Sequence, residues 1–183
     1  MRKCSIALIG FRATGKSVIG KLLGEKLSMD FMDMDDELVA SLGQDIDSWV
    51  RAHGWESFRD AESRLLDSLA ERNRLVLATG GGVILRPSNR KILKERFVVI
   101  WLQASPETIR LRLSQDPRTS SHRPPLTDLP IEDEINRVLL ERCPIYEEAA
   151  DLSIRTDGST PSESVSQIQA FWEIHCPDSL APA

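Results

Sequence analysis

Residues 4–27 read CSIALIGFRATGKSVIGKLLGEKL, and this stretch decides the fold. Residues 4–9 form a nearly continuous apolar run that stops at Gly10, which is typical of a central strand buried on both faces. Residues 18–27 repeat apolar side chains at helical spacing, so a helix follows the turn. A strand, a glycine turn and a helix in this order form the first half of a βαβ unit, and the sequence therefore predicts an α/β protein.

The rest of the chain repeats this alternation. Apolar runs at residues 75–78, 97–102 and 152–154 have the length of buried strands. The predicted helices are residues 56–71, 106–114, 131–148 and 161–172. Ser105 before a proline, and Thr160 with Glu163 three residues later, are N-terminal signals for two of them. Strands that alternate with helices indicate a three-layer αβα fold, in which helices cover both faces of a parallel sheet.

The composition fits one globular domain. The chain has 183 residues, of which 41% are hydrophobic and 28% charged, and its net charge is -5. The acidic balance provides no general attraction for nucleic acid or an anionic membrane, so an anionic ligand needs a local cluster of cations. The apolar runs are far shorter than the roughly 20 residues that span a bilayer, and no signal peptide is evident. We therefore expect a cytoplasmic protein.

Cysteines and irregular segments complete the organisation. Cys4, Cys143 and Cys176 have no CxxC spacing, so free thiols are expected rather than disulfides or a zinc site. Residues 115–130 contain four prolines and many polar residues, and they are predicted to form a mobile lid rather than a regular element. Residues 1–174 are predicted to form a single domain, followed by a flexible tail over residues 175–183.

The turn after the first strand carries the clearest chemical signal. Residues 10–17, GFRATGKS, match the phosphate-binding pattern GxxxxGK[ST] between a strand and a helix. Backbone N–H groups of residues 13–17 are expected to surround a phosphate, Lys16 to reach the β- and γ-phosphate oxygens, and Ser17 to bind Mg²⁺. The sequence therefore predicts a site for a nucleoside triphosphate.

Two aspartates follow the next short run. If Asp33 and Asp35 lie in an extended strand end, they project to the same side, where one organises water around Mg²⁺ and the other binds a substrate hydroxyl. Acidic residues are also common in the first turn of a helix, and residues 33–37 are typical of one. The pattern alone leaves both interpretations open.

A glycine triplet and several arginines are further candidates. Gly80, Gly81 and Gly82 follow a predicted strand, and ligands bind at the carboxyl ends of strands in open α/β sheets. A backbone free of side chains there favours close approach of a ligand. Arginine suits carboxylates and phosphates because its planar fork makes paired hydrogen bonds, but spacing alone does not select any one arginine.

Six motifs occur together and in order: the phosphate-binding loop, FMDMD at residues 31–35, GWESFRDAE at 54–62, the glycine triplet, RPPL at 123–126 and ERCPIY at 141–146. From about Ser5 to residues 160–161, the chain resembles the shikimate kinase family. The resemblance implies the nucleoside-monophosphate-kinase-like P-loop fold with a five-stranded parallel sheet. It also implies transfer of the γ-phosphate of ATP to the 3-hydroxyl of shikimate, a step of chorismate and aromatic amino-acid biosynthesis.

The resemblance implies individual roles as well. Asp35 holds the shikimate hydroxyls and takes the proton, Asp33 positions Mg²⁺ through water, and Arg123 lies in the lid on the transferring phosphate. The implied catalytic residues are Lys16, Asp35 and Arg123. The implied ATP-binding residues are Ala13, Thr14, Gly15, Lys16, Ser17, Val18 and Arg123. The implied shikimate-binding residues are Asp35, Arg59, Gly80, Gly81, Gly82 and Arg142, with Arg59 and Arg142 on the carboxylate.

Mg²⁺ is the implied cofactor, and ATP and shikimate are the implied partners of a monomer that binds neither nucleic acid nor membrane. Residues 157–161 are expected near adenine. The family usually has glycine where this chain has Ala13, so that position must adopt a conformation that a β-carbon allows. The predicted lid is longer than the commonest form, and the adenine-side arginine is left open among Arg110, Arg112 and Arg118.

Other P-loop proteins fit the sequence less well. A gluconate kinase of the same fold would share the phosphate-binding loop, but the pairing of Arg59 with Arg142 argues against it. A GTPase needs an Asn-Lys-x-Asp motif, which this sequence lacks. A motor or transporter ATPase usually shows a longer apolar run that ends in a Walker B aspartate, also missing here.

Overall fold

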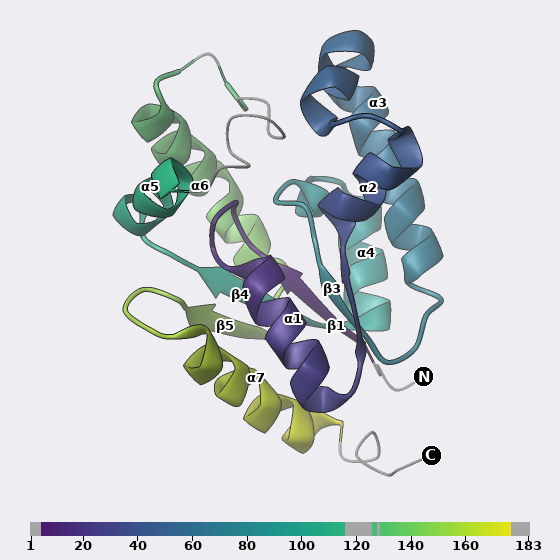
Figure 1. Cartoon of the computed structure of the whole chain (residues 1–183), viewed down its shortest axis with the longest axis vertical. Coiled ribbons are helices and arrows are strands. Elements are labelled where there is room, and N and C mark those ends of the chain that lie inside the picture. Colours follow the sequence, from purple (N-terminus) through teal and green to yellow (C-terminus); the bar gives the residue numbers. More distant parts are fainter. Residues whose placement is uncertain (1–4, 116–125, 128, 177–183) are drawn as a thin grey trace.

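The computed structural model describes residues 5–115, 126–127 and 129–176. Within these ranges, five strands form one parallel sheet in the order β2-β3-β1-β4-β5 (Figure 1). The strands are β1 (Ser5–Ile9), β2 (Asp30–Asp33), β3 (Leu75–Ala78), β4 (Phe97–Gln103) and β5 (Leu152–Arg155). The first strand lies in the middle of the sheet, as its continuous apolar run predicts.

Helices cover both faces of this sheet. They are α1 (Lys16–Leu27), α2 (Met34–Leu42), α3 (Ile46–Leu69), α4 (Pro87–Arg96), α5 (Pro106–Gln115), α6 (Ile131–Ala149) and α7 (Pro161–His175), with a short 3-10 helix at Val83–Leu85. Side chains of α1 and α7 pack on one face, and side chains of α3, α4 and α6 pack on the other. The three-layer αβα prediction and the all-parallel sheet are confirmed.

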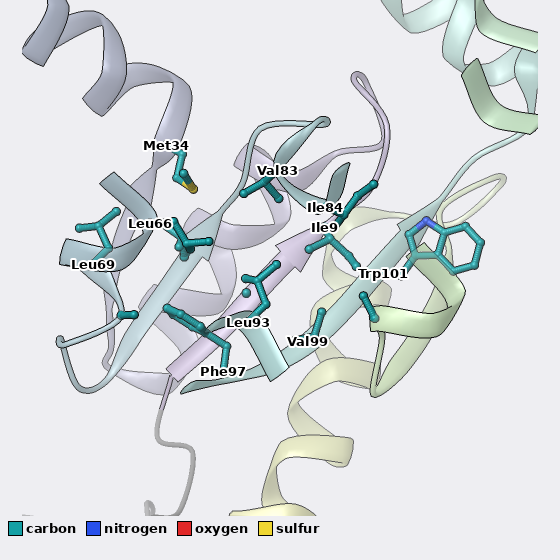
Figure 2. Close-up of a cluster of buried hydrophobic side chains, with 14 of the residues drawn as sticks. Ile9, Met34, Leu66, Leu69, Val83, Ile84, Leu93, Phe97, Val99 and Trp101 are labelled. Carbon is teal, nitrogen blue, oxygen red and sulfur yellow. The ribbon is translucent and has the colours of Figure 1, made fainter. Parts of the chain in front are cut away.

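Alternate residues of the central strand point to opposite layers. Ala7 and Ile9 belong to the core beneath α4 and α6, where Figure 2 shows Ile9 beside Leu93 and Val99. Ile6 and Leu8 belong to the core beneath α1 and α7. Each of the four strand residues is 0% exposed, so apolar burial fixes β1 from both sides. The loop that follows β1 therefore starts from a rigid base.

The sequence predicted too few and too short helices on the side of the molecule that contains α3. The structure adds α4, extends the possible first turn at residues 33–37 into a full helix, α2, and begins α3 at Ile46 rather than at residue 56. Gly54 has φ 80° and ψ 165°, so it kinks α3 and interrupts the helical periodicity. In α4 only Asn89 and Leu93 are buried, and such a narrow contact leaves a weak apolar pattern.

The C-terminal helix is also longer than predicted. It extends to His175 instead of ending at Trp172, and Cys176 is buried against the core, so residues 175–176 belong to the fold rather than to a tail. The predicted capping box of Thr160 and Glu163 is confirmed. Among the described residues, the free thiol predicted at Cys143 is confirmed too.

Several predictions fall outside the described residues. These concern Cys4, most of the predicted lid with Arg118 and Arg123, and residues 177–183. In the described part of the chain, no helix is both long and apolar enough to cross a bilayer.

Candidate active site

The loop after β1 has the backbone that phosphate binding requires. Gly10 and Gly15 have φ values of 140° and 96°, which glycine adopts readily. A β-carbon on Gly10 would lie 2.4 Å from the carbonyl oxygen of Leu102, so only glycine fits there. Ala13 also takes a left-handed conformation, with φ 61°, so this alanine keeps the turn in spite of its β-carbon.

The start of α1 faces a cavity formed by this loop. Ala13, Gly15, Lys16, Ser17 and Val18 line the cavity, here called the phosphate cavity. The first turn of α1 has no acidic residue, so the positive end of the helix dipole is directed at the cavity without a competing carboxylate. The predicted loop residue Thr14 is buried instead, and its hydroxyl donates to the carbonyl of Phe11 at 2.8 Å.

Lys16 supports the loop with its side chain. Its ammonium group donates to the carbonyl oxygens of Gly10 and Phe11 at 2.9 and 2.8 Å. The ammonium group is therefore held over the loop that surrounds the phosphate cavity, where it can neutralise phosphate charge.

Asp33 and Asp35 both line the phosphate cavity, although only Asp33 belongs to the strand. Asp33 ends β2 and caps α2 by accepting the backbone N–H of Asp35 at 3.0 Å. The first-turn interpretation is therefore confirmed for the backbone of Asp35. The hydroxyl of Ser17 donates to Asp33 Oδ2 at 2.5 Å, which brings two hard oxygen groups together at one wall.

A second cavity, here called the acceptor cavity, adjoins the first. The residues that line it are Phe11, Arg12, Asp35, Ile46, Trp55, Phe58, Arg59, Glu62, Gly80, Gly81, Gly82, Leu126 and Arg142. The structure thus brings Arg59 and Arg142 together with Asp35 and the glycine triplet, as predicted. The cavity lies at the carboxyl edge of the sheet, which is flanked by α2 and α3 on one side and by α5 and α6 on the other (Figure 1).

Arg59 is fixed by contacts on several sides. Its guanidinium donates to Glu62 Oε2 at 2.7 Å, and its central carbon lies 5.1 Å from the Trp55 ring and 5.2 Å from the Phe58 ring. A β-carbon on Gly82 would lie only 2.3 Å from Arg59 Nη2. Gly82 is therefore needed for the position of the guanidinium. The sequence had explained this glycine only as room for a ligand.

Arg142 is held from the opposite wall. Arg142 Nη1 and the hydroxyl of Tyr146 both donate to the carbonyl oxygen of Gly81, at 3.1 and 2.5 Å. Burial raises the pKa of Tyr146 to about 12, so this hydroxyl keeps its proton and remains a donor. Tyr146 was part of a quoted motif, but the sequence assigned it no role. The structure shows that it fixes the backbone of the glycine triplet.

Glu62 is a further residue that the sequence analysis left without a role. It is 0% exposed, and burial raises the pKa of its carboxyl although Arg59 acts in the opposite direction. A β-carbon on Gly80 would lie 2.6 Å from Glu62 Oε1 and 3.1 Å from Asp35 Oδ1, so both carboxyls approach the same backbone carbon. The signal in the sequence was the spacing of Arg59 and Glu62, which share one face of a helix.

The structure separates two of the arginines left open for the adenine side. Arg112 lines the phosphate cavity and donates to the carbonyls of Ala13 and Thr156 at 3.1 and 2.8 Å. Arg110 instead pairs with the exposed Glu132. Asp157, at the start of the segment expected near adenine, accepts the backbone N–H of Ser105 at 2.8 Å, and such hydrogen bonds lower its pKa to about 2 although desolvation opposes them.

Comparisons with known proteins agree with this geometry. A family model described as shikimate kinase matches residues 12–173. A shikimate kinase of Nitratidesulfovibrio vulgaris is 40% identical over 170 residues, which cover 92% of this chain and 97% of that protein. The solved structure of a shikimate kinase from Acinetobacter baumannii in complex with shikimate has a TM-score of 0.86 and 31% identity, and covers 98% of this chain and 96% of its own.

A gluconokinase from Sinorhizobium meliloti is a more distant structural neighbour. It has a TM-score of 0.52 and 16% identity, over 93% of this chain and 92% of its own. A likeness at that level of identity shows a shared fold and nothing more specific.

Proposed function

Because the chain belongs to the shikimate kinase family, it is an enzyme that phosphorylates shikimate, and we propose that the γ-phosphoryl group of ATP passes to the 3-hydroxyl between the two cavities described above. The observation that carries this proposal is the adjacency of the cavities. One is formed by a phosphate-binding loop, and the other contains Arg59 and Arg142 with Asp35 at the boundary.

The phosphate cavity is the proposed ATP site. Backbone N–H groups of Ala13, Thr14, Gly15, Lys16 and Ser17 bind the phosphates, Val18 lies beside them, and the Lys16 ammonium moves from the loop carbonyls to the β- and γ-phosphate oxygens. Of the two candidates in the described residues, Arg112 rather than Arg110 is the proposed adenine-side arginine, because it reaches this cavity; Arg118 lies outside the described residues. Residues 157–161 are proposed to lie near the base.

Mg²⁺ fits the donor set at Ser17 and Asp33. Both groups present hard oxygen atoms to the phosphate cavity, and in proteins Mg²⁺ is usually bound by one or two such groups together with water and substrate phosphates. Among the described residues, no cluster of three or more metal-binding side chains occurs, which matches a metal shared with ATP. Ser17 is proposed as a ligand and Asp33 as a ligand through water, and the metal supplies charge neutralisation at the phosphates.

The acceptor cavity is the proposed shikimate site. Arg59 and Arg142 bind the carboxylate by charge-assisted hydrogen bonds, while the backbone at Gly80, Gly81 and Gly82 lies against the ring. Asp35 holds the hydroxyls and accepts the proton of the attacking one, because its carboxylate is the acidic group that lines both cavities. The hydroxyl oxygen forms its bond to phosphorus as the bond to ADP breaks.

Arg123 lies outside the described residues, so its role on the transferring phosphate stays a prediction. The same holds for the lid, the single-domain organisation and the monomeric state. We also propose that the enzyme acts in the cytoplasm, where ATP is supplied, and that its partners are small molecules rather than nucleic acid or membrane.

A coupled assay that measures ADP release tests the function. ATP and Mg²⁺ are combined with one acceptor at a time: shikimate, quinate, gluconate or a nucleoside monophosphate. Of these four acceptors, we expect turnover only of shikimate. Gluconate is the informative competitor because it also carries a carboxylate and hydroxyls. Turnover of gluconate above that of shikimate would overturn the proposal. A Lys16→Ala preparation serves as the control for contaminating kinases.

A further inference from the structure

The boundary between the two cavities contains a residue with no role so far. In the described part of the chain, Arg12, Asp35 and Gly81 line both cavities. A phosphoryl group that moves from one cavity to the other must pass these three residues. Asp35 supplies a carboxylate and Gly81 supplies backbone. Arg12 supplies the positive charge at this boundary. It occupies one of the variable positions of the loop pattern GxxxxGK[ST], so the pattern itself does not require an arginine there.

The side chain of Arg12 is fixed in place. It forms an ion pair with Glu134, and the side chains are 12% and 2% exposed. The central guanidinium carbon also lies 5.4 Å from the ring of Phe11. Charges are weakly screened at such low exposure, so a phosphate beside Arg12 would interact with it far more strongly than with a surface arginine.

Glu134 connects Arg12 to another part of the acceptor cavity. Its second carboxylate oxygen accepts the backbone N–H groups of Leu126 and Thr127 at 2.7 and 2.8 Å. Leu126 lines the acceptor cavity. One buried carboxylate at the start of α6 therefore fixes a cation on the phosphate-binding loop and a wall residue of the acceptor cavity, which are far apart in the sequence.

On the basis of the site assignment above, we propose that Arg12 is a further catalytic residue and Glu134 its positioning residue. Glu134 pairs with Arg12 Nη2, and the guanidinium, which lines both cavities, is proposed to donate to oxygens of the phosphoryl group in transit. The phosphorus–oxygen bond to ADP breaks, the bond to the shikimate hydroxyl forms, and the hydroxyl proton goes to Asp35. Arg12 stabilises the charge during this transfer and takes no proton.

The first test is Arg12→Gln, which removes the charge but keeps a polar side chain. Removal of one such donor lowers kcat by about 10²- to 10³-fold in comparable sites. We expect a loss of this order, with the Kd of shikimate and the Kd of ATP each within about threefold of wild type. The Kd values are measured by tryptophan fluorescence and by calorimetry. Arg137→Gln, which removes an exposed arginine of α6, is the matched control and should keep full activity.

A binding measurement without turnover complements the rate. Shikimate, ADP, Mg²⁺ and aluminium fluoride together mimic the transition state, and wild type should bind this mixture more tightly than shikimate and ADP alone. Arg12→Gln should lose that extra affinity. The proposal is overturned if Arg12→Gln keeps kcat within threefold of wild type, or if the loss appears equally in the Kd of shikimate. Failure of wild type to phosphorylate shikimate would instead contradict the proposed function.

Glu134→Gln tests the positioning role. Its amide can still accept one of the backbone N–H groups but no longer pairs with Arg12 by charge, so we expect a smaller loss of kcat, about tenfold. The double variant should be no slower than Arg12→Gln alone, because positioning matters only while Arg12 is present. Additive losses would overturn this role. Glu132→Gln, at an exposed carboxylate of the same helix turn, is the control. If the unpaired Glu134 prevents folding of Arg12→Gln, the double variant, which removes both charges, provides the kcat and Kd comparison.

Discussion

Substitution of Gly82 by alanine should damage shikimate binding through Arg59 while leaving the fold intact. Gly82 has φ -104° and ψ 0°, a conformation that alanine adopts without strain. A β-carbon there would lie 2.3, 2.4 and 2.5 Å from three atoms of the Arg59 guanidinium. Ordinary contact requires about 3.4 to 4 Å, so the guanidinium must move by roughly 1 Å or more. Such a shift breaks the 2.7 Å hydrogen bond from Arg59 to Glu62.

The magnitude follows from the proposed hydrogen bond between Arg59 and the carboxylate of shikimate, which the displaced guanidinium can no longer make. A charge-assisted hydrogen bond contributes about 1.5 to 3 kcal/mol, which corresponds to roughly 10- to 150-fold in affinity. Gly82→Ala should therefore raise the Kd of shikimate by about this factor, nearly as much as Arg59→Ala, with the Kd of ATP unchanged. Trp55 lies beside Arg59, so a tryptophan fluorescence titration with shikimate can follow the binding.

Gly81→Ala is the matched comparison. A β-carbon on Gly81 would meet no atom closer than 3.4 Å, which is ordinary contact, so the Kd of shikimate should rise by no more than about threefold. The reasoning is refuted if Gly82→Ala binds shikimate like wild type, or if both alanine variants lose affinity to the same extent. Equal losses would mean that the triplet serves ligand approach alone and that the contact between Gly82 and Arg59 has no consequence.

Lys16→Ala should abolish turnover without unfolding the protein, because the ammonium neutralises phosphate charge and hydrogen-bonds to carbonyls of the loop rather than packing in the core; circular dichroism checks the fold, and activity within a few-fold of wild type would contradict the ATP site. Asp35→Asn should lower kcat by about 10² to 10⁴ if the carboxylate takes the proton, whereas a change in KM alone would reduce its role to binding. Ala13→Gly should raise the free energy of unfolding by about 0.5 to 1 kcal/mol, since relief of the left-handed strain exceeds the entropy that glycine adds to the unfolded chain; urea denaturation measures this, and destabilisation would contradict it. Burial raises the pKa of Glu62 above its ordinary value of 4.5, so its contribution to stability is largest at low pH and is lost as the pH rises through the raised pKa. The Tm of Glu62→Gln should therefore increase relative to the Tm of wild type as the pH is raised from 4.5 to 7.5. A difference in Tm that instead moves in favour of wild type over this range would contradict the pKa direction.

Much of the fold was predictable because its signals are local. Apolar runs of strand length and a loop motif between a strand and a helix identify β1, β3, β4, β5 and α1 from short windows of sequence. The elements that were missed lack such local signals. The kink at Gly54 divides the pattern of α3, and α4 contacts the core through only a few side chains, so the three-dimensional packing rather than periodicity reveals them.

The candidate site divides in a similar way. The predicted residues, such as Lys16, Asp35 and Arg59, lie within motifs and face a cavity. The residues without an assigned role, Glu62, Tyr146 and Glu134, contact other site residues. Tyr146 and Gly81 are 65 positions apart, and Arg12 and Glu134 are 122 apart, so no local pattern records either contact.

The parallel sheet explains why such distant pairs meet. In this topology the carboxyl ends of β1 and β3 are neighbours, and the loops that follow them bring Arg12 and Gly81 to the same edge. Helix α6 crosses that edge, with Glu134 in its first turn and Arg142 and Tyr146 further along. One helix therefore contacts the phosphate-binding loop at its start and the glycine triplet through its later turns. A shift of α6 would disturb both cavities together, because the side chains that hold them belong to the same rigid element.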